Sequence, residues 1–339
     1  MNFNTMKKIL TAVIFLSLFL ANTSIASLPK IVATTTIIED ITNKIGGDKV
    51  DVVSLVPIGG DPHLYEPIPQ DAITISKAQL ILVNGLTLEG WLTEFIDNSG
   101  TKAIMINTTT GITPIQSSTY ANSPDPHAWM DAENGIIYAE NIKNALSEID
   151  QENQAFYQAN FDAYKKELET LDQKMKDLIQ SIPDEKRVLI TSHDAFQYYG
   201  RKYGIRLESI LGTSTDSEAQ TSDINRLYKV IRESKVPAIF IESTINPQTM
   251  KQIAKDTKVK IGAKLYADSL GEPDSPGGSY TGMLLTNTEN IVNGLLGKSS
   301  IEVEGNDAEN GGKSNIIFFI IFGVLLVGGA FVMFRKMNA

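Results

Sequence analysis

The sequence of 339 residues contains no cysteine. This absence excludes disulfide bonds, thiolate zinc sites, iron–sulfur clusters and cysteine nucleophiles. It also excludes the acylated cysteine that attaches bacterial lipoproteins to a membrane. Basic residues are outnumbered as well, with 30 Lys and Arg against 40 Asp and Glu, so the formal net charge is −10. A chain of this sign does not favour nucleic acid as a partner.

The overall composition is that of an ordinary globular protein. Apolar residues make up 42% of the chain and charged residues 21%, which provides enough apolar side chains for sizeable cores and argues against general disorder. At about 150 residues per domain, the length predicts about two domains.

The N-terminus resembles an export signal and not part of a fold. Lys7 and Lys8 precede an apolar run over residues 9–21, and small and polar residues then lead to Ala26. This order predicts a signal peptide over residues 1–26. An uncleaved anchor is the alternative, although the apolar run is short for a membrane span.

The C-terminus carries a longer apolar segment. Residues 316–334 are nineteen consecutive positions without a charge, and Arg335 and Lys336 follow them. This pattern predicts a transmembrane helix whose basic end lies in the cytoplasm. The polar, acidic and Gly-containing residues 298–315 predict a flexible spacer ahead of it. We therefore expect an extracytoplasmic protein, in the periplasm or at the cell surface, anchored in the cytoplasmic membrane.

Between the two ends, short β-branched runs alternate with helical patterns, which predicts an α/β fold of parallel sheets and crossover helices. The predicted strands cover residues 30–35, 49–56, 80–83, 103–107, 187–192, 206–210, 238–242 and 260–266. The predicted helices include residues 37–45, 70–77, 221–233, 247–255 and 281–296.

One long helix interrupts this alternation. Residues 151–181 contain neither Gly nor Pro, and their apolar side chains recur at steps of three and four, which predicts one helix with a single apolar seam. A coiled-coil dimer is the alternative, but the flanking α/β pattern favours an intramolecular helix and a monomer. We predict an N-terminal lobe over residues 27–149, a rigid linking helix over residues 150–182 and a C-terminal lobe over residues 183–297.

The chain has only three histidines, and all three lie in predicted loops beside strands or helices. His63 follows a strand in GGDPH, His127 precedes a helix in PDPH, and His193 ends a strand in TSHD. Open α/β sheets bind ligands outside the carboxyl ends of their strands, so the three imidazoles can face one crevice. One such histidine alone would more often be structural, but three predict a shared metal site. Pro62 and Pro126 stiffen two of the loops.

Asp268 follows the last strand of the second lobe and is the expected fourth ligand, although a helix-capping or loop role is the alternative. This ligand set places the ion in the cleft between the lobes. Three nitrogens and one oxygen suit zinc, and the same donors bind manganese or iron. We expect one divalent ion per chain, with zinc favoured. Four neighbouring acids could orient the imidazoles or instead cap helices or face solvent: Glu66, Asp125, Asp194 and Glu242.

Six strings resemble the signatures of the metal-binding receptors of ATP-binding-cassette importers for zinc and manganese, a periplasmic zinc-uptake and adhesin-like family. In chain order they are GGDPHLYEPIPQDAITISKAQLILVNGLTLEGWL, PDPHAWMDAENGIIYAENIKNAL, TSHDAFQYYGRKYGI, GTSTDSEAQTSDI, IFIESTINP and GAKLYADSLGEPDSPGGSYTGML. The resemblance as a whole runs over residues 30–296. The resemblance implies a two-lobed fold with a backbone helix, and metal ligands at His63, His127, His193 and Asp268.

The resemblance also implies a membrane permease as partner. The sequence departs from the family pattern in two places, one that concerns the membrane anchor and one that concerns the choice of metal. The lipoprotein cysteine of the family is missing, so we expect the span over residues 316–334 to replace it. The His-rich loop of many zinc specialists is also missing, since residues 112–124 hold no histidine. Specialists for manganese or iron often carry Glu at the third ligand position, so His193 favours zinc, or zinc together with manganese.

Three classes of function compete for this sequence. A secreted metallohydrolase needs an open coordination position and a nearby general base, and the sequence has no H-E-x-x-H pair. A surface adhesin would have a membrane anchor but no need of a buried metal site. We therefore predict a non-enzymatic receptor that captures a divalent metal ion for an importer.

Overall fold

The computed structural model describes residues 27–116, 123–216 and 219–298. Within them strands and helices alternate along the chain, as the sequence predicts. The expected signal peptide over residues 1–26 and the expected anchor over residues 316–334 lie outside the described residues. In the part of the chain that is described, no helix is both long and apolar enough to cross a bilayer.

The first lobe contains a four-stranded parallel sheet in the order β2-β1-β3-β4. Its strands are β1 (Lys30–Ala33), β2 (Asp51–Ser54), β3 (Leu80–Val83) and β4 (Ile104–Asn107). Ile31 of β1 pairs with Val52 on one side and with Leu80 on the other. All four residues of β3 are buried, as expected for a parallel strand that is covered on both faces.

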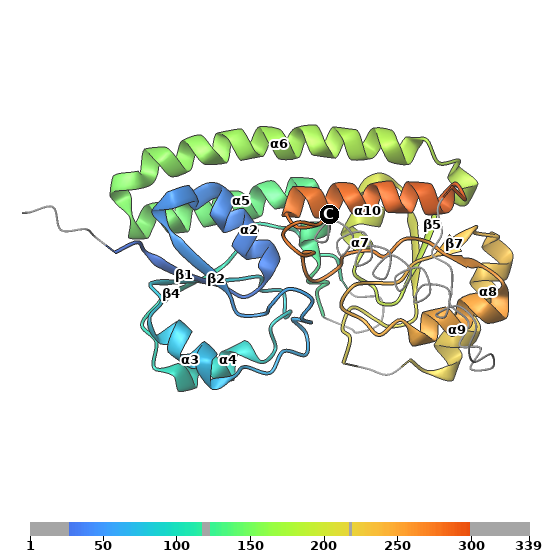
Figure 1. The fold of residues 1–339 in the computed structure, drawn as a ribbon, viewed down its shortest axis with the longest axis horizontal. Helices are drawn as coiled ribbons and strands as arrows, with labels where there is room; N and C mark the ends of the chain where they lie inside the picture. The colour runs from blue at the N-terminus through green and yellow to red at the C-terminus, as the bar shows by residue number, and fades with distance from the viewer. Residues whose placement is uncertain (1–26, 117–122, 217–218, 299–339) are drawn as a thin grey trace, which may run out of the picture. The chain divides into compact units, whose positions relative to one another are not determined.

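Helices cover the two faces of this sheet: α2 (Thr36–Gly46), α3 (Pro69–Ser76) and α4 (Leu92–Ser99). Helix α2 begins directly after β1 because the hydroxyl of Thr35 accepts a hydrogen bond from the Ile38 N–H at 3.3 Å. In Figure 1, α3 and α4 lie on the opposite side of the sheet from α2. The sheet, α3 and α4 enclose a small core of Val32, Leu55, Ile75, Ile81, Val83 and Leu92.

The second lobe contains two parallel strand pairs. The first joins β5 (Val188–Thr191) to β6 (Arg206–Ser209), and the second joins β7 (Ala238–Ile239) to β8 (Lys260–Ile261). The Phe240 N–H donates to the carbonyl oxygen of Ile190 at 2.8 Å, which connects the two pairs. The accompanying helices are α7 (Gln197–Tyr203), α8 (Thr221–Ser234), α9 (Gln248–Thr257) and α10 (Tyr280–Leu295).

The strands expected over residues 238–242 and 260–266 are much shorter than predicted. The Gly262 N–H donates to the Ile239 carbonyl and the Leu265 N–H donates to the Ile241 carbonyl. From Gly262 to Leu265 the chain advances three residues, whereas its partner strand advances two, from Ile239 to Ile241. The extra residue after Gly262 interrupts the hydrogen-bond ladder as a β-bulge does. One parallel bridge, between Glu242 and Leu265, follows the interruption. The chain then continues to the predicted metal ligand of this lobe.

The predicted long helix is α6 (Gln154–Gln180), which follows α5 (Ala132–Ile149) after a short 3₁₀ turn. Figure 1 shows α6 passing along both lobes. Its buried seam contains Tyr157, Phe161, Tyr164, Leu168, Leu171, Met175 and Ile179. This seam packs against α2, α5 and α10 of the same chain. The apolar periodicity is therefore accounted for within one chain, and no coiled-coil partner is needed to bury it.

Hydrogen bonds between buried groups connect the two lobes beside α6. The Trp129 indole N–H donates to the Ala267 carbonyl at 2.9 Å, and the Tyr280 hydroxyl donates to the Trp129 carbonyl at 2.5 Å. The Tyr198 hydroxyl donates to the Asp125 carbonyl at 3.0 Å. These bonds fix the backbone directly beside two of the predicted metal ligands.

Candidate metal centre

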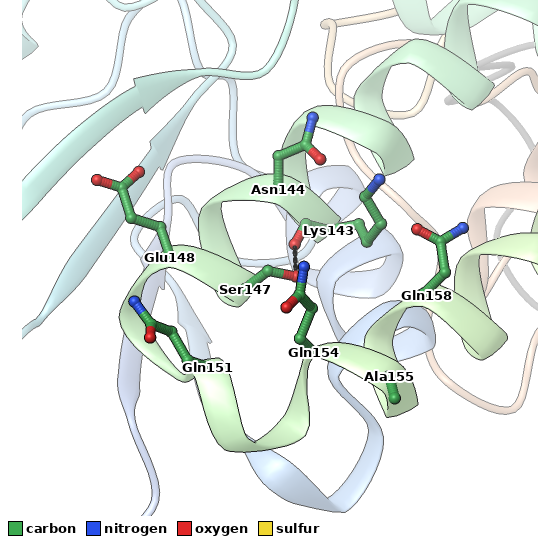
Figure 2. A pocket seen from close by; sticks show the side chains of 8 residues that line it. All are labelled: Lys143, Asn144, Ser147, Glu148, Gln151, Gln154, Ala155 and Gln158. Atoms are coloured by element: carbon green, nitrogen blue, oxygen red, sulfur yellow. Dashed lines mark hydrogen bonds between the residues drawn. The ribbon is translucent and has the colours of Figure 1, made fainter.

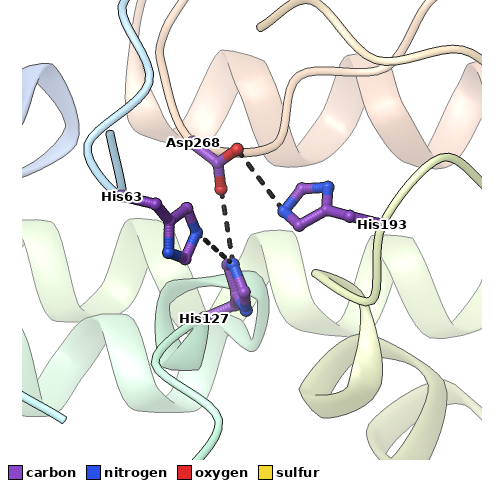
Figure 3. Close-up of side chains that lie close together, drawn as sticks. All are labelled: His63, His127, His193 and Asp268. Carbon is purple, nitrogen blue, oxygen red and sulfur yellow. Dashed lines mark hydrogen bonds and ion pairs between the residues drawn. The ribbon is translucent and has the colours of Figure 1, made fainter. Parts of the chain in front are cut away.

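The structure brings all four predicted ligands together. One ligand atom from each of His63, His127, His193 and Asp268 lies within 4.8 Å of the other three. Figure 3 shows the four side chains converging from separate segments of the chain. Two come from the first half of the chain and two from the second, as the sequence predicts.

The distances between these atoms suit a small ion. The Nε2 atoms of His63 and His127 are 3.2 Å apart, and the two oxygens of Asp268 lie 3.5 Å from Nε2 of His127 and of His193 respectively. Ligand atoms placed about 2.0 Å from a tetrahedral zinc ion are about 3.3 Å from one another. These three separations are therefore close to those expected around one small bound ion, and all four ligand atoms lie within 4.8 Å of one another.

Each ligand stands at the end of a regular element. His63 lies in the loop that leaves β2, His127 precedes the 3₁₀ turn Ala128–Met130 and α5, and His193 follows β5. Asp268 follows the interrupted strand β8. Both DPH tripeptides form the same tight turn, in which Oδ1 of the Asp accepts the His N–H at 2.9 Å.

The centre is buried, and several of its polar atoms make no hydrogen bond. His127 and His193 are 0% exposed and Asp268 is 1% exposed, whereas His63 is partly buried. Among the described residues, Nε2 of His193 and Oδ1 of Asp268 make no hydrogen bond. Buried polar atoms are normally hydrogen-bonded, so unpaired atoms that face a common point are what a metal ion would satisfy.

Two of the four neighbouring acids orient the imidazoles. Oδ1 of Asp125 lies 2.7 Å from Nδ1 of His127, and Oε2 of Glu242 lies against Nδ1 of His193. Glu242 also accepts the backbone N–H groups of Ser192 and His193 at 2.8 and 3.0 Å. A carboxylate at Nδ1 directs Nε2 toward the metal, which is the usual support of a histidine ligand.

The other two acids do not take this role. Asp194 accepts a hydrogen bond from the Gln197 amide at 2.7 Å, and Glu66 is exposed. Sequence reasoning also missed two contributors. Asp61 forms the turn that positions His63, a role that the repeated DPH word could have signalled. The Thr244 hydroxyl donates to Oδ2 of Asp268 at 3.1 Å, and no feature of the sequence marks it.

The three histidines of the centre differ in pKa because different charges surround them. Burial, together with the like charges of the other two imidazoles, lowers the pKa of His63 to about 3. Burial also acts to lower the pKa of His127, but Asp125 and Asp268 outweigh it and raise that pKa to about 9. In the same way Glu242 and Asp268 outweigh burial and raise the pKa of His193 well above its usual range. Before metal binds, imidazolium forms of His127 and His193 therefore offset part of the negative charge of the three buried carboxylates beside them.

A second hollow, of 590 Å³, lies on the surface between α5 and α6 (Figure 2). It is lined by Lys143, Asn144, Ser147, Glu148, Gln151, Gln154, Ala155 and Gln158. It contains one carboxylate and no imidazole, so it offers no ligand set comparable to the four-residue centre.

The geometry agrees with a comparison against known families. The model of the family described as "Zinc-uptake complex component A periplasmic" matches residues 31–294. The chain belongs to this family. The resemblance seen in the sequence motifs is thereby confirmed, and so is the two-lobed α/β fold that it implies.

Known proteins are similar to this sequence over most of the chain. The metal ABC transporter substrate-binding lipoprotein FimA of Streptococcus parasanguinis is 38% identical over 274 residues, which are 78% of this chain and 89% of the relative. The manganese ABC transporter substrate-binding lipoprotein PsaA of Streptococcus pneumoniae is also 38% identical, with the same coverage.

Solved structures of the family agree in fold. The periplasmic zinc binding protein TroA from Treponema pallidum has a TM-score of 0.76 at 31% identity, covering 79% of this chain and 99% of that one. The Mn-bound periplasmic metal binding protein from Candidatus Liberibacter asiaticus has a TM-score of 0.73 at 34% identity, with the same coverage.

The raised pKa values of two histidines predict that metal binding releases protons. At pH 7, zinc must displace a proton from His127 and another from His193, so we expect about two protons released per ion. The apparent affinity should then rise by roughly 100-fold per pH unit between about pH 6 and 7.5. Calorimetric titrations in buffers of different ionisation enthalpy measure the proton count. Imidazoles with ordinary pKa values near 6.5 would instead give an affinity that is flat above that pH, and this result would contradict the charge assignment.

The contact between Asp125 and His127 predicts the effect of a conservative substitution. Asp125→Asn removes the charge at Nδ1 of His127, and we expect zinc affinity to fall by about 10- to 100-fold. Asp194→Asn is the matched control, because it makes the same change in a buried carboxylate that binds Gln197 instead of a ligand. Competition with a chelator of known affinity measures both. Equal losses in the two variants would show that the effect is not specific to the imidazole contact.

Proposed function

We propose that this chain is an extracytoplasmic substrate-binding protein that captures a divalent transition metal and delivers it to the permease of an ATP-binding-cassette importer. One observation carries the proposal: three imidazoles and one carboxylate from both lobes converge within 4.8 Å, and three of them are fully buried. Ligands divided between two lobes can release their ion when the lobes move apart, which suits a carrier. The relatives named above are substrate-binding proteins of metal importers, which supports the same function.

The ligand set argues against a role in catalysis. Catalytic zinc sites keep a coordination position open for water or substrate. Here the ion would be held through His63, His127, His193 and Asp268, which fill a tetrahedral shell. The chain therefore acts as a binding protein, and the ion is its cargo.

Zinc is the favoured cargo, with manganese as the second ion. A site of three nitrogen donors and one carboxylate generally binds zinc more tightly than manganese. The solved relatives include a zinc binding protein and Mn-bound and Cd-bound forms of another protein, so the fold is compatible with more than one divalent ion.

The membrane attachment that we propose differs from that of the relatives. FimA and PsaA are named lipoproteins, and this chain has no cysteine to carry a lipid. Residues 316–334 would span the membrane instead, and residues 298–315 would tether the two lobes to it. A receptor fixed to the membrane of its permease has a raised effective concentration there.

Removing single ligands tests the function. In His193→Ala and Asp268→Asn, zinc affinity should fall by more than about 100-fold, because loss of a ligand costs more than loss of its supporting partner. Wild-type protein incubated with equal zinc and manganese should retain one ion per chain, chiefly zinc, by elemental analysis. Cells of the source organism that carry either variant should lose uptake of radioactive zinc at low supply.

The control for this experiment is Asp194→Asn, which should bind zinc and support uptake as the wild type does. Wild-type affinity in both ligand variants would refute the site. Normal uptake by cells that lack the gene altogether, under zinc and manganese limitation, would refute the transport role even if the site binds metal.

The proposed anchor predicts the behaviour of a truncated chain. A protein that ends at Gly297 should bind zinc as the full chain does, because all four ligands lie upstream, but it should leave the membrane fraction. Fractionation of cells followed by immunoblotting measures this. A truncated protein that stays with the membranes, or a full-length protein in the soluble fraction, would contradict the anchor.

A further inference from the structure

The two DPH tripeptides form the same turn but use their carboxylates differently. In each, Oδ1 of the Asp accepts the N–H of the His two residues later at 2.9 Å. Oδ1 of Asp125 also contacts Nδ1 of His127, so this imidazole is fixed by its own loop. Oδ2 of Asp61 instead accepts a hydrogen bond from the hydroxyl of Thr215 at 2.6 Å.

The bond between Asp61 and Thr215 crosses from one lobe to the other. Asp61 lies in the loop after β2 of the first lobe, and Thr215 lies between β6 and α8 of the second, 154 positions later in the chain. The same loop makes a further bond to the second half of the chain, from the Gly59 N–H to the Ser269 hydroxyl at 2.8 Å. The loop that carries His63 is thus held by groups of the opposite lobe, in addition to the Trp91 indole N–H of its own lobe, which donates to the Pro62 carbonyl at 2.9 Å.

His63 also differs from the other ligands in its surroundings. It is the one ligand of the four that is partly buried, whereas the other three are fully enclosed. His63 is therefore the ligand of the four that protein encloses least. A group that controls the position of His63 acts on this least enclosed ligand.

From these contacts we infer that Asp61 is a positioning residue that makes the placement of His63 depend on lobe closure. One oxygen of its carboxylate sets the turn that presents His63, and the other is bound to Thr215 only when the lobes are together. Opening of the lobes breaks the second bond, so the turn keeps only the contacts of its own lobe and holds His63 less firmly as the cleft opens. The inference rests on the proposed function, because it concerns retention of the captured ion.

Substitutions of Thr215 test this coupling. The purified full-length chain, kept in mild detergent, is loaded with zinc and mixed with excess chelator, and the rate of zinc loss is recorded. A hydrogen bond to a charged group contributes enough for about a tenfold change in rate, so we expect Thr215→Val to lose zinc about tenfold faster. Thr215→Ser retains the hydroxyl and should remain near the wild-type rate.

Thr281→Val is the matched control, because it removes a hydroxyl that donates to a carboxylate, that of Glu167, at 2.9 Å, away from the centre. It should lose zinc at the wild-type rate. The double variant Asp61→Asn/Thr215→Val should be no faster than the faster single variant, since Asp61→Asn weakens the same bond that Thr215→Val removes. A wild-type rate in Thr215→Val, equal rates for the Val and Ser variants, or additive effects in the double variant would overturn the inference. Failure of the wild type to hold zinc would instead refute the proposed function, so the two failures are distinguishable.

Discussion

The structure depends on the balance of charge inside one buried centre. Asp125, Glu242 and Asp268 are carboxylates with almost no exposure, and burying such groups is costly unless positive charge lies beside them. His127 and His193 supply that charge as imidazolium groups before metal binds. A divalent ion can replace those two protons without changing the total charge. The centre can therefore exist in a metal-free and a metal-bound form, which is the property that a carrier needs.

The fold supplies this centre from two sides. Helix α6 packs against elements of both lobes, while His63, His193 and Asp268 follow β2, β5 and β8 and His127 precedes α5. Bonds such as those from Trp129 to Ala267 and from Asp61 to Thr215 connect the lobes close to the ligands. The linking helix is thus stabilised by a continuous apolar seam. The same apolar core includes Trp129, Ala267 and Leu270 beside the centre, and hydrogen bonds add to this packing between the lobes.

The sequence predicts much of this and fails at identifiable places. The convergence of the three histidines could be predicted because only three exist and all of them lie in loops, and the seam of α6 could be predicted from its spacing. The ends of β7 and β8 could not be predicted from the sequence. The extra residue between Gly262 and Leu265 is identified only from the hydrogen bonds between the two strands. The roles of Thr215 and Thr244 could not be predicted either, since a hydroxyl that bonds across a fold leaves no local pattern.

The central claim is that one divalent ion is held between the lobes by ligands from both. A crystal structure of the zinc-loaded protein, with diffraction data collected on both sides of the zinc absorption edge, tests it most directly. The account predicts one anomalous peak per chain, about 2.0 Å from Nε2 of His63, His127 and His193 and from an oxygen of Asp268. A peak bound by residues of a single lobe, or bound elsewhere on the chain, would contradict it.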